Sequence, residues 1–375
     1  MEVSTCMEDG IVQDWEAATK LWEHGIRECL YADPSDHPVL LTEQIWNPDE
    51  NRARAMEFFF ETLDAPAFYA AKSPVCSLFA SGKGSGLVVD VGADVTTVTP
   101  VIDGLVLYRP ARRTRLAGNH LNERVQAMFS EQGITVTPRY RVLAKEVVDV
   151  GEAAQYTARD FAFSVTDTFA AQETARVLEE FKETCVEAEG EDEKEAVFEF
   201  PDGYRHRFSA GARRAVANEA LFQSGATADD ALVAVPDAAA DEAGSEPTTK
   251  TDVDALTTTD RTTGGFSTRG VVDLIADTIQ ACDVDVRANL ANNIVLTGGT
   301  TLLTGFTQRV NQELTQTLSG LKVRIHAPGN TIERRNSAWI GGSILASLGT
   351  FHQLWISKKE YEEVGVPKLL EKRFR

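Results

Sequence analysis

The chain has 375 residues, of which 43% are hydrophobic and 8% aromatic, so it is long enough to form two domains with buried cores. Its 57 acidic and 37 basic residues give a formal net charge of -20, which argues against nonspecific binding to nucleic-acid phosphates. This charge is compatible with basic partners and equally with a solvated acidic surface, and composition does not choose between them.

The sequence contains no apolar run of the ~20 residues that a membrane span needs, and its N-terminus lacks a basic and then apolar signal pattern. We therefore expect a cytosolic or nuclear protein without a membrane partner. The cysteines have neither C-x-x-C nor metal-ligand spacing, so we expect reduced thiols and no metal centre: Cys6, Cys29, Cys76, Cys185 and Cys282.

The first part of the chain reads as alternating helices and strands. Asp14 is a plausible N-cap for an amphipathic helix that ends before Pro34, and residues 37–43 are typical of a buried strand. Asn47 is expected to cap the next helix, with Pro48 at its first position.

Residues 87–100 predict a hairpin with an acidic tip. An apolar strand reaches Asp90, the chain turns through Gly92 and Asp94, and a β-branched run from Val95 returns. Glycine at such a turn lets successive backbone N–H groups point at one anion, and a carboxylate at a strand end can hold a metal-bound water. These residues therefore indicate either a phosphate-binding turn or an ordinary tight turn between core strands.

Two later stretches add candidate residues. A helix around 177–186 presents Lys182 and Glu183, either to a site or as part of an exposed, ion-paired face. Gly298 and Gly299 lie between an apolar strand and a helix N-terminus, where free N–H groups favour a phosphate.

The middle of the chain is less regular. Residues 135–151 read as a solvated helical or irregular segment, and residues 197–208 read as a hairpin with Asp202 and Gly203 at its turn. No aromatic residue occurs between Phe222 and Phe266, so we expect a disordered acidic insertion at about 224–265.

Three stretches in one order resemble the actin family, within the wider superfamily of actin, heat-shock-chaperone and sugar-kinase ATPases: residues 87–100, 293–305 and 333–362. The resemblance implies an α/β, actin-like fold with two lobes, each a mixed sheet flanked by helices. We expect an incomplete first lobe at 1–116 and a second lobe at 117–310. Residues 311–375 would complete the second lobe and return to the first with C-terminal partner-binding helices.

The family's first phosphate hairpin, and the small exposed subdomain that follows it, have no counterpart in this sequence. Either the sequence is a fragment or truncated gene product, or the protein has lost one wall of its nucleotide site. Truncation is favoured, because missing central strands leave sheet edges and apolar faces unpaired.

The resemblance also implies a nucleotide between the lobes, ATP with Mg²⁺, although the missing first phosphate loop makes this binding doubtful. Asp90 would lie near the magnesium. The phosphates, sugar and base would be contacted by Gly92, Ala93, Asp94, Val95, Gly118, Gly298, Gly299, Thr300, Leu302, Lys182, Glu183 and Arg335.

Hydrolysis of that nucleotide needs a residue that orients or deprotonates the attacking water. Conventional actin has a glutamine, a second aspartate and a histidine where this chain has Ser73, Ala93 and Thr97. Serine and threonine hydroxyls are too short and too weakly basic to replace those groups. We therefore expect a degenerate site without a catalytic residue, unless another side chain orients the water.

Several departures from actin resemble the nuclear actin-related protein 4 subfamily: residues 72–74, 92–93, 138–146, 333–335 and 348–357. That resemblance implies a noncatalytic subunit of chromatin-remodelling or histone acetyltransferase complexes, located in the nucleus with a cytoplasmic fraction allowed. The subunit would pair with monomeric actin on a helical scaffold segment of a remodeller ATPase or acetyltransferase subunit. Histones are a further candidate partner, and no sequence-specific nucleic-acid binding is expected.

The resemblance places the scaffold helix in a cleft lined by Phe79, Ile340, Ile344, Leu345, Leu348 and Leu354. Ile340, Ile344 and Leu348 share one helical face, a spacing that fits either core packing or a partner helix in a groove. The alternative function is a cytoskeletal, actin-like, nucleotide-binding filament protein, which only general similarity to actin favours.

Overall fold

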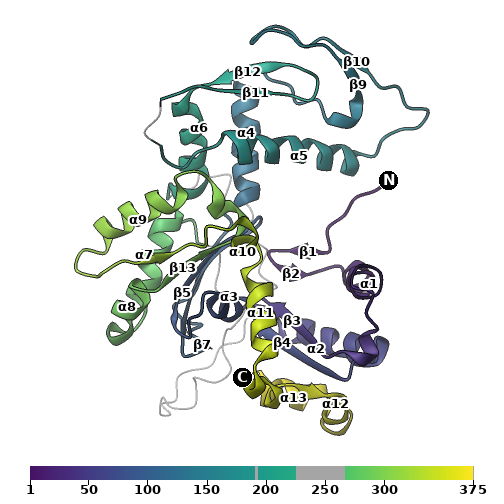
Figure 1. Ribbon diagram of the computed structural model, residues 1–375, viewed down its shortest axis with the longest axis vertical. Helices are drawn as coiled ribbons and strands as arrows, with labels where there is room; N and C mark the ends of the chain where they lie inside the picture. Colours follow the sequence, from purple (N-terminus) through teal and green to yellow (C-terminus); the bar gives the residue numbers. More distant parts are fainter. Residues whose placement is uncertain (191–192, 225–266, 375) are drawn as a thin grey trace, which may run out of the picture.

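Two mixed sheets, one of six strands and one of three, form the framework of the structure. The computed structural model describes residues 1–190, 193–224 and 267–374, and Figure 1 shows their arrangement. The expected insertion at 224–265 lies outside the described residues except for Ser224. Both sheets are flanked by helices, which confirms the predicted α/β class.

The six-stranded sheet joins segments that are about 200 residues apart in the sequence. Its order is β14-β13-β5-β6-β7, with β8 also paired to β6. Strand β13 is parallel to β5 and β14, whereas β6 is antiparallel to its neighbours. The strands are β5 (Gly86–Val91), β6 (Thr96–Ile102), β7 (Leu105–Val106), β8 (Arg112–Thr114), β13 (Ile294–Thr297) and β14 (Ile325–His326).

The three-stranded sheet has the order β15-β4-β3. Strand β3 (Val39–Glu43) is parallel to β4 (Ala67–Lys72), and β15 (Ile356–Ser357) is antiparallel to β4. Two-stranded ladders are formed by β1 (Met7–Glu8) with β2 (Ile11–Val12), β9 (Val142–Lys145) with β10 (Tyr156–Ala158), and β11 (Ala196–Glu199) with β12 (Arg205–Phe208).

Helices surround both sheets (Figure 1). Helices α7 and α8 contact the six-stranded sheet, and α3 contacts strands of both sheets. The helices are α1 (Trp15–His24), α2 (Asp49–Glu57), α3 (Ser73–Ala80), α4 (Gly118–Glu131), α5 (Asp167–Cys185), α6 (Ala210–Ala217), α7 (Val271–Ala281), α8 (Val284–Ala291), α9 (Phe306–Thr317), α10 (Thr331–Arg335), α11 (Ser337–Ser347), α12 (Lys358–Val364) and α13 (Val366–Arg373). Among the helices that the structure describes, none combines the length and apolar character needed to cross a membrane.

Each sheet has its own hydrophobic core. The larger core packs α4, α5 and the β11–β12 hairpin around Phe129, Phe181 and Phe208. The smaller core packs α2 and α13 against the three-stranded sheet and contains Met56 and Phe68. Burial of these large side chains supplies most of the driving force for folding.

Strands β5 and β6, which form the predicted hairpin at 87–100, belong to the same sheet as β13 and β14. The reason is the parallel pairing of β5 with β13, a nonlocal contact that no local pattern specifies. The segment 1–116, expected to be the first lobe, therefore contains strands of both sheets, and the change of sheet occurs before Gly86.

Local expectations held at Asp14 and failed at two other places. Asp14 caps α1 by accepting a hydrogen bond from the backbone N–H of Ala17 at 3.1 Å. Asn47 does not cap α2, because its amide donates to the Glu43 carboxylate at 2.7 Å and the helix begins at Asp49. Residues 135–151, expected to be helical or irregular, contain strand β9, which pairs with β10, the next strand along the chain.

Helices α3 and α11 pack with their backbones in direct contact. A Cβ atom added to Gly341 would lie 1.7 Å from the carbonyl oxygen of Cys76 on α3, a separation that no atom pair tolerates. Gly341 is therefore required by space, although its backbone dihedrals are helical and any residue could adopt them.

We expect the Gly341→Ala substitution to lower the free energy of unfolding by about 3 kcal/mol, because α3 and α11 must move apart. Urea denaturation of both proteins measures this loss. Gly349→Ala is the matched control, since nothing lies within 4 Å of its added Cβ. Equal stability of the two variants would show that the helices do not pack in this way.

Candidate functional site

Asp90 and Gly298 meet at the ends of the paired strands β5 and β13. The register places Asp90 beside Thr297, so Gly298 follows immediately at the carboxyl edge of the sheet. Gly298 has φ of 91°, and a Cβ there would lie 2.6 Å from the Asp90 carboxylate. Both the backbone conformation and the lack of space require glycine at this position.

The turn of the hairpin docks onto the start of α4 and onto the short helical turn Gly299–Leu302. The backbone N–H groups of Gly118 and Asn119 donate to the carbonyls of Gly92 and Ala93 at 3.0 and 2.7 Å. The hydroxyl of Thr300 donates to the carbonyl of Gly92 at 2.8 Å. The predicted residues of this hairpin, of α4 and of the glycine turn thus form one contiguous surface.

The residues expected to contact the nucleotide base also lie close to one another. Lys182 on α5 donates to the carbonyl of Gly118 at 3.2 Å, and Glu183 accepts from Arg335 on α10 at 2.6 Å. A Cβ on Gly299 would lie 3.7 Å from the Arg335 side chain. Burial lowers the pKa of Lys182, and the neighbouring glutamates oppose that effect only in part.

The remaining predicted residues lie at the margins of this surface. Val95 is buried just before β6, and Leu302 is half-buried at the end of the Gly299–Leu302 turn. Asp94 at the tip accepts a hydrogen bond from the side-chain amide of Asn119 at 2.5 Å. Sequence analysis did not identify Asn119, and only its place directly after Gly118 could have indicated it.

Asp90 places a carboxylate at the end of β5, on this surface. Burial raises its pKa from the ordinary 3.8 to about 6, because a charged carboxylate loses its hydration there. The described residues contain no group of three or more side chains that could hold a metal ion.

Two basic side chains lie at this surface, but several of its backbone N–H groups are already paired. The backbone N–H groups of Gly118, Asn119 and Gly298 already donate to backbone carbonyls. The start of α4 therefore has fewer N–H groups available to bind an anion than a helix whose first N–H groups are all unpaired. Arg335 and Lys182 supply positive charge beside Gly299 and Gly118. These groups suit an anionic ligand, with the hairpin turn as its neighbour.

The three positions expected to orient or deprotonate the attacking water carry side chains that are weak bases or not basic at all. The hydroxyl of Ser73, at the start of α3, donates to the carbonyl of Glu43 at 3.1 Å. Thr97 is 4% exposed and lies opposite Asp90 in the β5–β6 ladder, and Ala93 has only a methyl group. None of the three side chains is a general base at neutral pH.

A row of three buried hydroxyls, which sequence analysis missed, connects α3 and α11 with strand β13. Ser337 on α11 donates to Ser77 on α3 at 3.0 Å and lies 2.5 Å from the hydroxyl of Thr297 on β13. Thr297 also donates to the carbonyl of Arg334 at 2.8 Å. All three hydroxyl residues are at most 6% exposed.

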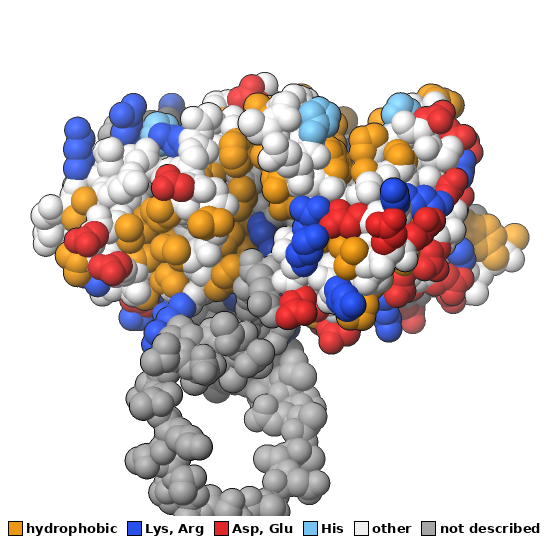
Figure 2. All heavy atoms as spheres, turned by 90° about the horizontal axis from the view of Figure 1, so that it is seen from below, with side chains coloured by type: hydrophobic (Ala, Val, Ile, Leu, Met, Phe, Trp, Pro, Cys, Tyr) orange, Lys and Arg blue, Asp and Glu red, His pale blue; other side chains and the backbone are white. Residues whose placement is uncertain are grey.

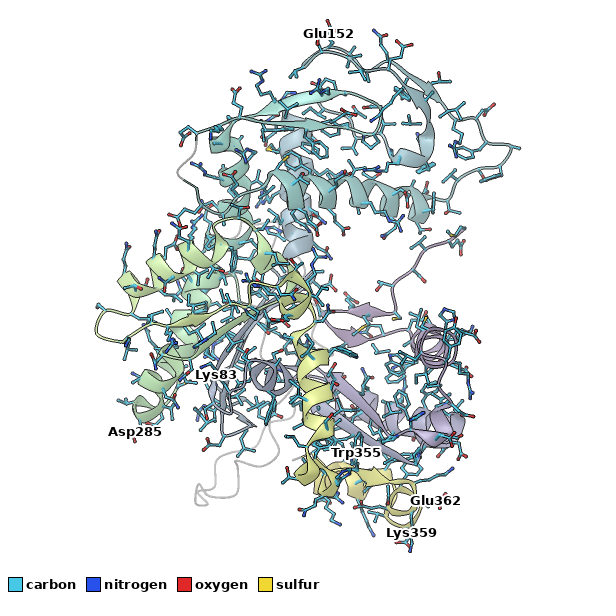
Figure 3. The ribbon with its side chains drawn as sticks, viewed as in Figure 1. Lys83, Glu152, Asp285, Trp355, Lys359 and Glu362 are labelled. Atoms are coloured by element: carbon cyan, nitrogen blue, oxygen red, sulfur yellow. The ribbon has the colours of Figure 1, made fainter. Side chains whose placement is uncertain are left out.

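The residues predicted to line a partner cleft lie on α3, on α11 and on the segment that follows α11. Ile344, Leu348 and Leu354 are 41%, 40% and 43% exposed, and the other three residues, Phe79, Ile340 and Leu345, are half-buried. Trp355 lies at the lower end of α11 beside Leu354 (Figure 3), with its ring centroid 5.1 Å from that of Phe351. Apolar side chains thus remain accessible at the end of α11 that is farther from Asp90.

Comparison with known proteins gives a consistent result. The family model described as "Actin" matches residues 1–375. A protein named "Actin-related protein 4" from Yarrowia lipolytica is 43% identical over 382 residues, covering 100% of this chain and 80% of its own length. Its namesake in Schizosaccharomyces pombe is 38% identical, covering 100% of this chain and 85% of its own length.

A second protein of Schizosaccharomyces pombe is named "SWI/SNF and RSC complexes subunit arp42". It is 35% identical to this chain over 393 residues, and the match covers 100% of this chain and 86% of that protein.

The raised pKa of Asp90 predicts a pH-dependent stability. The native state binds the Asp90 proton more tightly than the unfolded chain, so this stabilisation is complete below pH 3.8 and is lost as pH rises through about 6. Relative to wild type, Asp90→Asn should raise the free energy of unfolding by at most about 3 kcal/mol above pH 6.5 and by less than about 1 kcal/mol near pH 4. Urea denaturation of both proteins between pH 4 and 8 tests this, and a pH-independent difference would contradict it.

Proposed function

The chain belongs to the actin family, and from this premise we propose that it is a noncatalytic actin-related subunit of nuclear chromatin-remodelling or histone acetyltransferase complexes. The relative named as a subunit of SWI/SNF and RSC complexes supports membership of a chromatin-remodelling assembly. The relatives named actin-related protein 4 support the subfamily. A nuclear location follows from the proposal.

Exposed apolar side chains on and after α11 are the observation that supports this proposal. Ile344, Leu348 and Leu354 leave apolar surface accessible on and just after α11, which is otherwise packed tightly against α3. An amphipathic helix covers such a groove with residues spaced three and four apart. The occupant proposed is a helical scaffold segment of a remodeller ATPase or acetyltransferase subunit, with monomeric actin bound beside this chain on the same helix.

Replacement of Ile344 by Asp should abolish co-purification of the scaffold subunit and actin from nuclear extract, because an unpaired carboxylate would be buried under the scaffold helix. Mass spectrometry of the material bound to the tagged protein measures this.

The control is Val284→Asp, which changes a 69% exposed apolar residue on α8 away from the cleft. Full recovery of the partners by the Ile344→Asp variant would refute the cleft assignment. Recovery of filament-binding proteins alone by wild type would favour the cytoskeletal function instead.

The proposal that the subunit is noncatalytic rests on the side chains near Asp90. Actin-family membership implies nucleotide binding in general. For this chain, ATP with Mg²⁺ would contact Asp90, the hairpin turn and the Gly298–Gly299 turn, and binding is expected to be weak because the surface covers one side of the ligand. Ser73, Ala93 and Thr97 supply no group to activate water, so bound ATP would be retained unhydrolysed.

We expect no release of phosphate above background when the purified chain is mixed in excess with radiolabelled ATP and Mg²⁺ in a single-turnover experiment. Asp90→Asn is the control for contaminating ATPases, because contaminants contribute equally to both preparations. Hydrolysis by wild type that the Asp90→Asn variant lacks would show that the site is catalytic.

A further inference from the structure

A cavity of about 390 Å³ lies between α6, α9 and the segment 187–190. It shares no lining residue with the surface around Asp90 or with the predicted partner cleft. Three of its lining residues, Gly190, Gly211 and Ala215, are exposed, and a Cβ on Gly211 would meet nothing within 4 Å. The cavity is therefore open to solvent, and its volume is in the range of small-ligand sites, about 300 to 1,000 Å³.

The backbone of Glu189, which lines this cavity, is held by the loop that precedes α9. Glu187 forms a parallel bridge with Thr304, and the backbone N–H of Ala188 donates to the carbonyl of Thr304 at 2.8 Å. A Cβ on Gly305 would lie 2.1 Å from the carbonyl oxygen of Glu189, so this loop fits closely against the segment. The half-buried Glu189 side chain thus extends from a fixed backbone.

The charges that line the cavity do not balance. Arg309 pairs with Glu313 at 2.7 Å. Arg214 pairs with Glu193 at 3.0 Å. Glu189 forms no ion pair with another described residue, so the cavity carries a negative charge that the arginines do not neutralise. A partly buried carboxylate of this kind favours a cationic ligand.

Gln312 on α9 restricts the geometry of that cation. With its side-chain amide oriented to suit both groups, its N–H donors contact both oxygens of Glu189, at 2.7 and 3.1 Å. These contacts occupy the side of the carboxylate between its two oxygens, which is the side that the planar fork of a guanidinium group uses. An ammonium group needs only one oxygen and approaches from the outer side, so it fits this arrangement better.

We propose that this cavity binds a primary alkylammonium group, with its charge on Glu189 and its aliphatic chain along Ala188 and Ala215. Lysine side chains of polypeptides and free aliphatic amines share this chemistry. An anionic ligand is disfavoured, because Glu189 would repel it. This site does not depend on the proposed function, on the partner cleft or on nucleotide.

Weak binding of cations to the acidic surface has to be separated from binding in the cavity. The chain has a formal net charge of -20, and Figure 2 shows acidic side chains gathered on the half of that face that carries α12. Amines collect at such a surface without a specific site. The matched control is therefore Glu362→Gln, which removes an exposed carboxylate from α12 (Figure 3).

The test is a saturation-transfer NMR titration of the full chain with butylammonium at about 0.15 M salt, where surface charges are screened. Wild type and Glu362→Gln should give the same saturable signal. Glu189→Gln, which keeps a hydrogen-bonding partner for Gln312, should weaken the affinity about tenfold or more. Gly211→Leu should also abolish binding, because its side chain would fill the cavity without a change in charge.

Two further amines identify the source of the ligand. One is lysine blocked at both ends as N-acetyl-lysine methylamide, and the other is spermidine. Tighter binding of the blocked lysine would support the proposal with a polypeptide as the source, and tighter binding of spermidine would support it with a free polyamine.

Three results would overturn the proposal. One is equal affinity of wild type and Glu189→Gln for butylammonium. Another is unchanged binding by Gly211→Leu, which would place the amine outside the cavity. The third is a saturable signal of equal affinity from butanol, which has the same length without the charge.

Discussion

The parallel pairing of β5 with β13 is the contact on which the proposed site depends. It joins residues 87–90 to residues 294–297 and so places the two turns that follow these strands next to each other. A shift of one residue would turn every side chain of β13 to the opposite face and separate Gly298 from Asp90. The close fit at Gly298 allows no side chain, so the pairing and the glycine require each other.

Helix α11 connects the same region to the exposed apolar residues proposed to bind a partner. Helix α11 begins at Ser337, beside Thr297 of β13, and carries the exposed apolar residues Ile344 and, just past its end, Leu348. Its other faces are committed to α3 and β3 by Gly341 and Gly342. Because α11 is packed closely on two sides, its exposed side chains are held in one orientation, as a rigid binding surface requires.

Sequence patterns predicted many local elements, but not how distant segments combine. The turn at Gly92, the glycines at 298–299 and the pair Lys182 and Glu183 were identified, and the structure brings them together. The pairing that brings β5 and β6 into one sheet with β13 joins segments that are far apart in the sequence, and the local patterns of these segments are ambiguous. The raised pKa of Asp90 depends on burial, which sequence does not report.

The buried hydroxyls of Ser77, Ser337 and Thr297 have an evolutionary consequence. Each of these hydroxyls donates a hydrogen bond to another hydroxyl of the group or accepts one from it, and all three are buried away from water. Replacing one by an apolar residue leaves its neighbour with an unmet bond, at a free-energy loss of about 1 to 3 kcal/mol, whereas replacing adjoining members together can be nearly neutral. Across the family, these three positions should therefore change as a group, although they are 40 to 260 residues apart in the chain.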